Sequence, residues 1–96
     1  MKTILFIHGL GGGADSRVPK ILRKLRPDLR VVCRTYGFDP EVALPQIRAW
    51  VEEVHPDLIM GESMGANYSL LVGRGIPHIL ISPATGAPSM RWCIVT

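Results

Sequence analysis

Ser63 lies at the centre of the segment GESMG (residues 61–65), with one glycine two positions before it and another two positions after it. The apolar run before this segment predicts a strand, and the residues after it predict a helix. In such a strand-to-helix turn, the pattern G-x-S-x-G presents the serine hydroxyl at the end of a sheet, where it can attack a carbonyl carbon. Gly61 and Gly65 suit the turn because they carry no side chain that would clash. We therefore expect Ser63 to be a nucleophile for acyl transfer; the alternative is a serine that only caps the helix.

Acyl transfer also needs backbone N–H groups directed at the oxyanion that develops on the substrate. The amide of Met64 stands at the amino end of the predicted helix and is the first candidate donor. The segment HGLGGG (residues 8–13) follows an apolar run, and its glycines allow the backbone to come close to the serine. Within this loop we expect the amide of Leu10 to be the second oxyanion donor, with Gly11 as the next choice.

Four apolar, strand-like runs alternate with three helical patterns along the chain. This alternation predicts an α/β fold of three layers, in which a parallel sheet carries helices on both faces. The carboxyl ends of the strands then lie at one edge, where such sheets bind ligands, and the serine turn and the glycine-rich loop both belong to that edge. The predicted strands are Thr3–His8, Arg30–Arg34, Leu58–Gly61 and His78–Ser82, and the predicted helices are Ser16–Arg26, a segment from Pro40 or Pro45 to Val54, and a segment from Met64 to Gly73 or Gly75.

The segments FIHGLGGG, MGESMGAN and ILISPA together resemble the alpha/beta-hydrolase superfamily, in particular its small bacterial esterases of the YqiA type. The resemblance extends to about Pro88 and leaves residues 89–96 as a tail outside the pattern. It implies a partial alpha/beta-hydrolase fold, an open parallel sheet with strand order 2-1-3-4. It also implies hydrolysis of a small-molecule ester or thioester through an acyl-serine intermediate, without a cofactor. His8 and Gly9 would then support the oxyanion loop, as Gly61 and Gly65 support the serine turn.

A serine hydroxyl is a weak nucleophile without an adjacent base. His55 and His78 each precede a predicted strand, so we expect them at the amino edge of the sheet, about 15 Å from Ser63. His8 is at the correct edge, but the resemblance assigns it to the oxyanion loop. In the superfamily an acid and then a histidine follow the serine, and this chain has no histidine after the fourth predicted strand. Every aspartate precedes the serine: Asp15, Asp28, Asp39 and Asp57.

Because these residues are absent, we expect the chain to correspond to the amino-terminal part of a hydrolase. It would then be truncated, frameshifted after about Pro88, or a naturally short relative. The tail MRWCIVT contains strand-like residues but has no predicted place. Without further strands, the fourth predicted strand would form a bare sheet edge, and such edges tend to pair with other chains. We therefore expect self-association through that edge, and slow or absent ester hydrolysis by the chain alone.

The chain has 96 residues, 47% of them hydrophobic and 20% charged, which predicts one globular domain over residues 1–96. The net charge is +3, and six of the 11 lysines and arginines lie in RVPKILRKLRPDLR (residues 17–30), where a solvated basic helix face is favoured over a nucleic-acid patch. No C-x-x-C motif or close Cys/His pair indicates a metal site or a disulfide framework. The amino terminus does not have the pattern of a signal peptide, and no stretch is long enough to span a membrane. We expect a cytoplasmic protein that binds neither nucleic acid nor membrane.

Two other functions stay open at this point. The segment GLGGGA (residues 9–14) satisfies G-x-G-x-x-A after a strand, and Arg34 could meet a 2′-phosphate, so a dinucleotide-binding domain is one alternative. That alternative leaves the serine turn unexplained, and the next helix is predicted to begin near Ser16, too late for the tight turn that a dinucleotide site needs. The other alternative is a non-catalytic module that retains the hydrolase fold, which the missing base supports.

Overall fold

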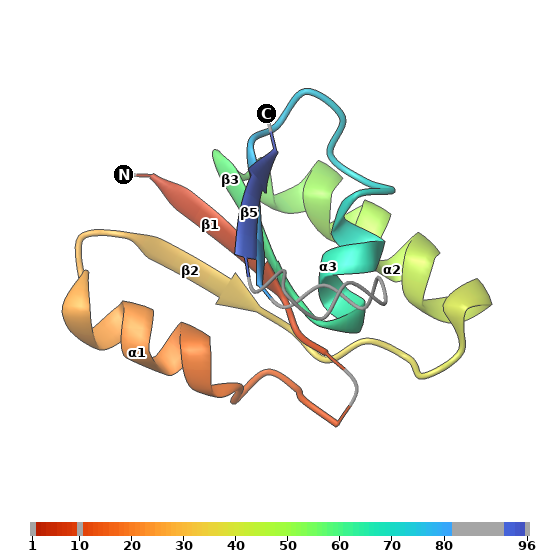
Figure 1. Ribbon diagram of the computed structural model, residues 1–96, viewed down its shortest axis with the longest axis horizontal. Coiled ribbons are helices and arrows are strands. Elements are labelled where there is room, and N and C mark those ends of the chain that lie inside the picture. Colours follow the sequence, from red (N-terminus) through yellow and green to blue (C-terminus); the bar gives the residue numbers. More distant parts are fainter. Residues whose placement is uncertain (1, 10, 82–91, 96) are drawn as a thin grey trace.

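A computed structural model of the chain describes residues 2–9, 11–81 and 92–95. The described segments form one sheet with helices packed against it (Figure 1). The elements are, in chain order, β1 (Thr3–Ile7), α1 (Arg17–Leu25), β2 (Arg30–Cys33), α2 (Pro40–Val54), β3 (Leu58–Glu62), α3 (Met64–Ser69), β4 (His78–Ile81) and β5 (Trp92–Val95).

The strands are arranged in the order β2-β1-β3-β4-β5. The first four of these are parallel, which confirms the predicted α/β class and the order 2-1-3-4. All five residues of β1 are buried, as its unbroken apolar sequence predicts for a strand between two parallel neighbours. Ile7 of β1 pairs with Gly61 of β3, so the chain segments that leave these two strands are neighbours at the carboxyl edge.

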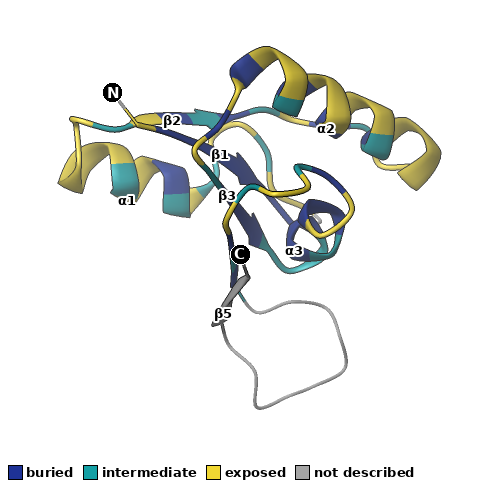
Figure 2. Cartoon of the chain, turned by 90° about the horizontal axis from the view of Figure 1, so that it is seen from above, coloured by how far each residue is buried: buried dark blue, intermediate teal, exposed yellow. Residues whose placement is uncertain are grey.

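Helices cover both faces of the sheet, as predicted, but they do so unequally (Figure 2). α2 and α3 lie over one face, where Leu5, Ile47 and Ile59 are completely buried. α1 lies over the other face, against β2, and covers a smaller core around Phe6. The larger core therefore joins β1 and β3, the two strands that lead to the serine turn and the glycine-rich loop, to α2 and α3.

α1 has the predicted amphipathic pattern, with Val18 and Leu22 packed against the sheet and its basic side chains exposed. Pro19 lies in the first turn, where its missing N–H is not needed. Ser16 precedes the helix at the predicted cap position, but it does not cap the helix with its side chain. Its Oγ accepts the amide of Gly13 (3.1 Å) and donates to the Gly13 carbonyl (2.6 Å), so Ser16 closes the glycine-rich loop instead.

α2 begins at Pro40, the earlier of the two predicted starts. Asp39 caps this end, because its Oδ1 accepts the amide of Glu41 at 2.9 Å. The helix ends at Val54, as predicted, where His55 takes the left-handed conformation with φ 49 and ψ 60.

α3 is shorter than predicted, since it ends at Ser69 and does not reach Gly73 or Gly75. After it, the amide of Leu71 donates to the carbonyl of Tyr68 at 3.0 Å, which tightens the chain into a turn. Gly73 (φ 61) and Gly75 (φ 88) adopt left-handed conformations in the segment that leads to β4. The two glycines therefore shape this connection and do not end the helix.

The expectation of a bare edge at the fourth strand is wrong, because β4 pairs along its whole length with the antiparallel strand β5. An antiparallel return needs only a loop, so no crossover helix signals it in the sequence. β2 and β5 are the outer strands of the sheet, and self-association through an edge remains a prediction. Ser82 of the predicted fourth strand and residues 89–91 and 96 of the tail lie outside the described residues.

Within the described segments, no helix has the length and apolar character that a membrane span requires.

The core on the α2 face can be tested by removing one methyl group. Ile47 in α2 is completely buried, whereas Ile21 in α1 is 42% exposed. We expect Ile47→Val to lower the free energy of unfolding by about 1 kcal/mol. The control Ile21→Val, also in a helix, should lower it by less than about 0.5 kcal/mol. Urea denaturation followed by circular dichroism measures both values, and equal losses would contradict the packing described.

Candidate active site

The register of the sheet brings the glycine-rich loop beside the serine turn. Ile7 pairs with Gly61, and two residues further along the chain lie Gly9 and Ser63. A Cβ atom added at Gly9 would lie 3.0 Å from the Cβ of Ser63 and 3.7 Å from its Oγ. A side chain at Gly9 would therefore fill the space next to the hydroxyl, and glycine leaves this space free.

Ser63 has φ 55 and ψ −120, a conformation that residues with a side chain rarely adopt. Its amide donates to the carbonyl of Ile81 (2.9 Å), and its carbonyl accepts the amide of Ala66 (3.0 Å). The first bond joins the turn to β4, and the second joins it to the first turn of α3. Met64 is the first residue of α3, so its amide has no acceptor inside the helix. The strained residue is thus fixed on both sides, as a nucleophile turn requires.

The two glycines of the serine turn lie where α3 packs onto the ends of the strands. A Cβ atom at Gly61 would lie 2.6 Å from the Cα of Ala66. At Gly65 a Cβ atom would overlap the carbonyl oxygens of Ile7 and His8. A side chain at either position would push α3 away from the sheet, so this turn requires both glycines.

The glycine-rich loop is anchored at both ends. The amide of Gly12 donates to the carbonyl of Gly9 (3.1 Å), which ties the loop to the end of β1. The amide of Ala14 donates to Oγ1 of Thr35 (3.0 Å), which ties it to the chain after β2. Leu10, the predicted second oxyanion donor, lies outside the described residues.

His8 is buried at the carboxyl end of β1, and its ring is engaged by its neighbours. Its Nδ1–H donates to the carbonyl of Gly9 (2.7 Å). The ring stacks on Tyr36, with centroids 4.1 Å apart and planes 9° from parallel. Nε2 is buried and has no hydrogen-bond partner among the described residues. These contacts favour a role in holding the loop, which the resemblance implies for His8, over a role as the base for Ser63.

Tyr36 has no place in the predicted site, yet it fixes His8. Its hydroxyl donates to the His8 carbonyl (2.5 Å), and its ring meets Tyr68 of α3 edge-on, with centroids 5.5 Å apart. It is also tilted against Trp50 of α2, at a centroid distance of 6.3 Å. Burial raises the pKa of Tyr36 to about 12, so the hydroxyl keeps its proton near neutral pH. The sequence offered one signal for this role of Tyr36: it comes just after the second predicted strand, so it lies at the same edge of the sheet as His8.

Neither of the other two histidines lies near Ser63. His55 ends α2 before β3 begins. His78 is the first residue of β4 and pairs with Ile59, which precedes Ser63 by four residues, or about 13 Å along a strand. Both histidines therefore belong to the amino edge, as predicted.

Three of the four aspartates have structural roles elsewhere. Asp28 is paired with Arg26 at 2.8 Å, and the hydrogen bond from Arg26 lowers the pKa of this carboxyl group. Asp39 caps α2, and Asp57 accepts the amide of Thr3 (2.8 Å) at the amino edge. Asp15 is exposed in the loop before α1. The described residues thus supply no pair of carboxylate and imidazole to the serine.

Cys33 is not a competing nucleophile. It is buried, and its Sγ–H donates to the carbonyl of Gly13 at 3.4 Å. Burial raises the pKa of the Cys33 thiol, which disfavours the reactive thiolate. In the part of the chain that the structure describes, no three His, Cys, Asp or Glu side chains gather in a group that could hold a metal ion.

The geometry of the loop does not favour a dinucleotide site. Such a site needs a helix that opens at the glycine turn, so that its amino end meets the phosphates. Here α1 begins only at Arg17, and Gly9 packs against Ser63. Arg34, which could have met a 2′-phosphate, is paired with Glu53 at 2.6 Å.

The carboxyl edge therefore combines a half-buried serine on a fixed turn with the end of a short helix and a close glycine-rich loop. No described residue forms a hydrogen bond with the Ser63 hydroxyl. Among the described residues, this arrangement offers a serine hydroxyl and backbone N–H groups at the start of a helix, and none of their side chains is bonded to that hydroxyl as a base would be. No protein-family model matches the chain, and no curated protein matches it with significant similarity.

The contact between Tyr36 and His8 can be tested by Tyr36→Phe. This variant keeps the ring but leaves the buried His8 carbonyl without its donor, which costs about 1–3 kcal/mol. We expect the free energy of unfolding in urea to fall by that amount at neutral pH. Tyr68→Phe is the matched control, because the Tyr68 hydroxyl bonds to no described residue, and its loss should be less than about 0.5 kcal/mol.

The stability difference between wild type and Tyr36→Phe should also depend on pH. The pKa of Tyr36 is about 10 in an unfolded chain and about 12 in the fold, so the unfolded chain loses this proton first as pH rises. The contribution of Tyr36 to the free energy of unfolding is therefore complete below about pH 10, and it is lost as the pH rises toward about 12. The stability difference between wild type and Tyr36→Phe should narrow over this interval. A difference that stays constant would show that Tyr36 is not held in this way.

Proposed function

We propose that this chain carries the nucleophile and the oxyanion donors of a serine hydrolase of the alpha/beta-hydrolase type. Ser63 would be the nucleophile toward a small-molecule ester or thioester. The observation that carries the proposal is the backbone conformation of Ser63, with φ 55 and ψ −120. Strain of this kind costs on the order of 1–3 kcal/mol and is concentrated at functional sites. A serine that only capped the helix would not need it, and Ser63 forms no side-chain cap hydrogen bond.

In the proposed reaction, Oγ of Ser63 attacks the carbonyl carbon of the acyl group, and the carbonyl oxygen becomes an oxyanion. The amides of Met64 and Leu10 would donate to that oxygen. Collapse of the tetrahedral intermediate expels an alcohol or a thiol and leaves the acyl group on Ser63. Water then attacks the acyl-serine and releases the carboxylic acid. The reaction needs no cofactor.

In the first step a base has to take the proton of the Ser63 hydroxyl and pass it to the leaving alcohol or thiol. In the second step it has to take a proton of water and return it to Oγ of Ser63. Of the three histidines in the chain, His8 is held by Gly9 and Tyr36, and the other two lie toward the amino edge. In a serine hydrolase without its base, oxyanion donors and substrate binding alone still give roughly 10³–10⁴-fold acceleration over water. We therefore expect slow acylation of Ser63, with slow or absent turnover.

A fluorophosphonate probe tests the proposal, because it forms a covalent bond with an accessible, polarised serine. We expect one adduct to accumulate slowly, visible by intact mass and located on Ser63 by peptide mapping. Ser63→Ala should abolish it. Ser69→Ala is the matched control, since Ser69 lies in α3, the helix that follows Ser63, where it is buried and donates to the Ala66 carbonyl (2.7 Å). This variant should label like wild type.

Hydrolysis of p-nitrophenyl acetate completes the test. We expect a rate no more than slightly above that of Ser63→Ala. Absence of labelling at Ser63 would favour the alternative of a non-catalytic module that retains the fold. Fast hydrolysis that depends on Ser63 would show that a base acts on the serine, and it would contradict the expectation of slow turnover.

A further inference from the structure

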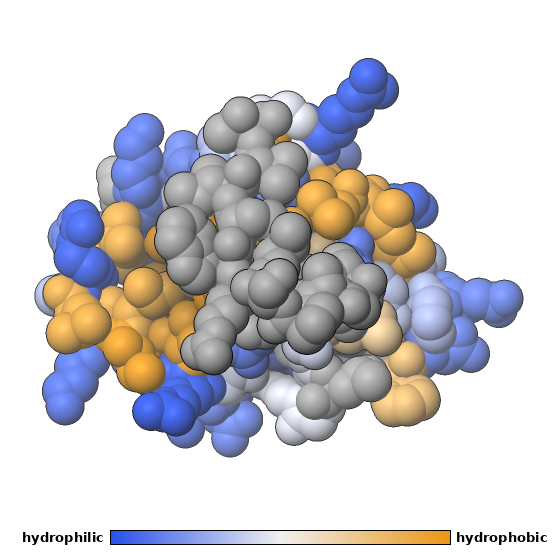
Figure 3. Space-filling view, viewed as in Figure 1, coloured by the Kyte–Doolittle hydropathy of each residue, from blue (hydrophilic) through white to orange (hydrophobic). Residues whose placement is uncertain are grey.

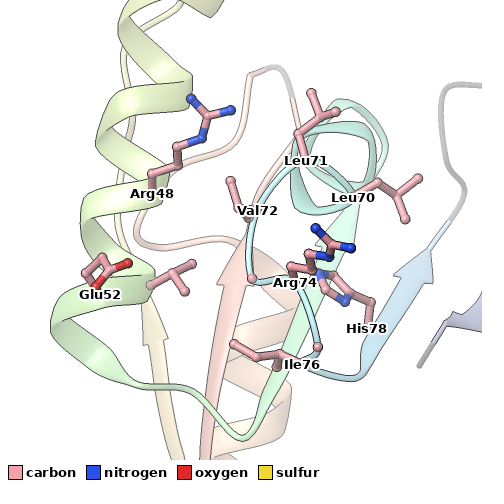
Figure 4. A pocket seen from close by; sticks show the side chains of 11 residues that line it. Arg48, Glu52, Leu70, Leu71, Val72, Arg74, Ile76 and His78 are labelled. Carbon is pink, nitrogen blue, oxygen red and sulfur yellow. The ribbon is translucent and has the colours of Figure 1, made fainter.

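A groove separates α2 from the segment that follows α3. Figure 4 shows Arg48 and Glu52 on the α2 side and the side chains of Leu70, Leu71 and Arg74 on the other side. The volume of the groove is about 700 Å³, within the range of roughly 300–1,000 Å³ that is typical of small-molecule sites. His78 also lines it, which sets the groove toward the amino edge and about 13 Å from Ser63 along the sheet.

The walls of this groove expose apolar side chains. Leu70 is 49% exposed and Leu71 is 59% exposed, and Val51 and Ile76 add further apolar surface. Figure 3 shows hydrophobic surface near the end of α3, where the two leucines follow the helix. Large apolar side chains that gather around a concave surface are typical of binding sites. The groove therefore suits a ligand with an aliphatic part.

The charged side chains that line the groove indicate the polar part of the ligand. Arg48 and Arg74 both line it, and neither forms an ion pair or a hydrogen bond with a described residue. Glu52 is the one acidic residue among those that line it, so the lining carries an excess of one positive charge. Nε2 of His78 is buried without a partner among the described residues. Guanidinium groups without a partner favour a carboxylate by charge and by hydrogen-bond geometry.

We propose that this groove binds a single-chain aliphatic carboxylate, with the hydrocarbon chain against Leu70 and Leu71 and the carboxylate in the field of Arg48 and Arg74. The apolar wall and the unpaired arginines carry this inference together, because either alone would fit many ligands. The site does not involve Ser63, and its occupancy does not depend on acyl transfer.

Titration with decanoate, below its micelle concentration, tests the proposal by ¹H–¹⁵N NMR of the intact chain. We expect saturable shifts in residues 48–52 and 70–78. Decyltrimethylammonium, which has the same chain length and the opposite charge, should bind at least several-fold more weakly. Ser63→Ala should bind decanoate like wild type, so the test stands apart from the proposed hydrolase function.

Variants separate the groove from general charge effects. Arg48→Gln and Arg74→Gln should each weaken decanoate binding roughly two- to fivefold, the range expected for one partly exposed ion pair. Glu52→Gln should tighten it. Arg17→Gln is the matched control, because Arg17 is exposed on α1 over the opposite face, and it should change nothing. Shifts outside the groove, equal binding of both amphiphiles, or an equal loss in Arg17→Gln would overturn the proposal.

Discussion

The arrangement of the carboxyl edge depends on the close approach of α3 to the end of β1. No side chain fits at Gly65, because its Cβ atom would overlap the carbonyl oxygens of Ile7 and His8. This contact limits where α3 can begin, and the chain turns from β3 into α3 at Ser63 with a positive φ. We infer that the strain at Ser63 accompanies the packing of a helix directly onto the end of a neighbouring strand. The register between β1 and β3 brings Gly9 next to the serine.

The energy to hold this strain comes from regular structure on each side of the turn. The hydrogen bond from Ser63 to Ile81 joins the turn to β4, and the buried core below α2 and α3 keeps the helix in place. Tyr36 extends this support to the glycine-rich loop through its bond to the His8 carbonyl and its contacts with α2 and α3. A marginally stable domain of this size retains such strain only where its surroundings determine the geometry.

Local sequence signals were sufficient for the features that depend on neighbouring residues. The apolar runs located β1 to β4, and the alternation of strands and helices predicted the α/β class. The order of the strands followed from the resemblance. The two glycines around Ser63 indicated the turn, because their reason is steric and lies within a few residues. Features that depend on distant contacts could not be predicted in the same way. β5 forms only because the tail returns to β4, and Tyr36 matters because β2 ends beside β1. The turn after Tyr68 sets the length of α3. The groove exists because this turn and the segment after it are separated from α2.

The strain at Ser63 is tested most directly by the unfolding free energy of Ser63→Gly. Glycine adopts a positive φ freely, and the strain relieved, on the order of 1–3 kcal/mol, exceeds the extra chain entropy of about 0.5–1 kcal/mol. We predict that Ser63→Gly is more stable than wild type by about 1 kcal/mol. Ser69→Gly, at the last residue of α3, should be less stable by at least a comparable amount, because it removes a buried hydroxyl that donates to the Ala66 carbonyl. If Ser63→Gly lost as much stability as Ser69→Gly, Ser63 would not be held under strain, and its conformation would no longer support a role as nucleophile.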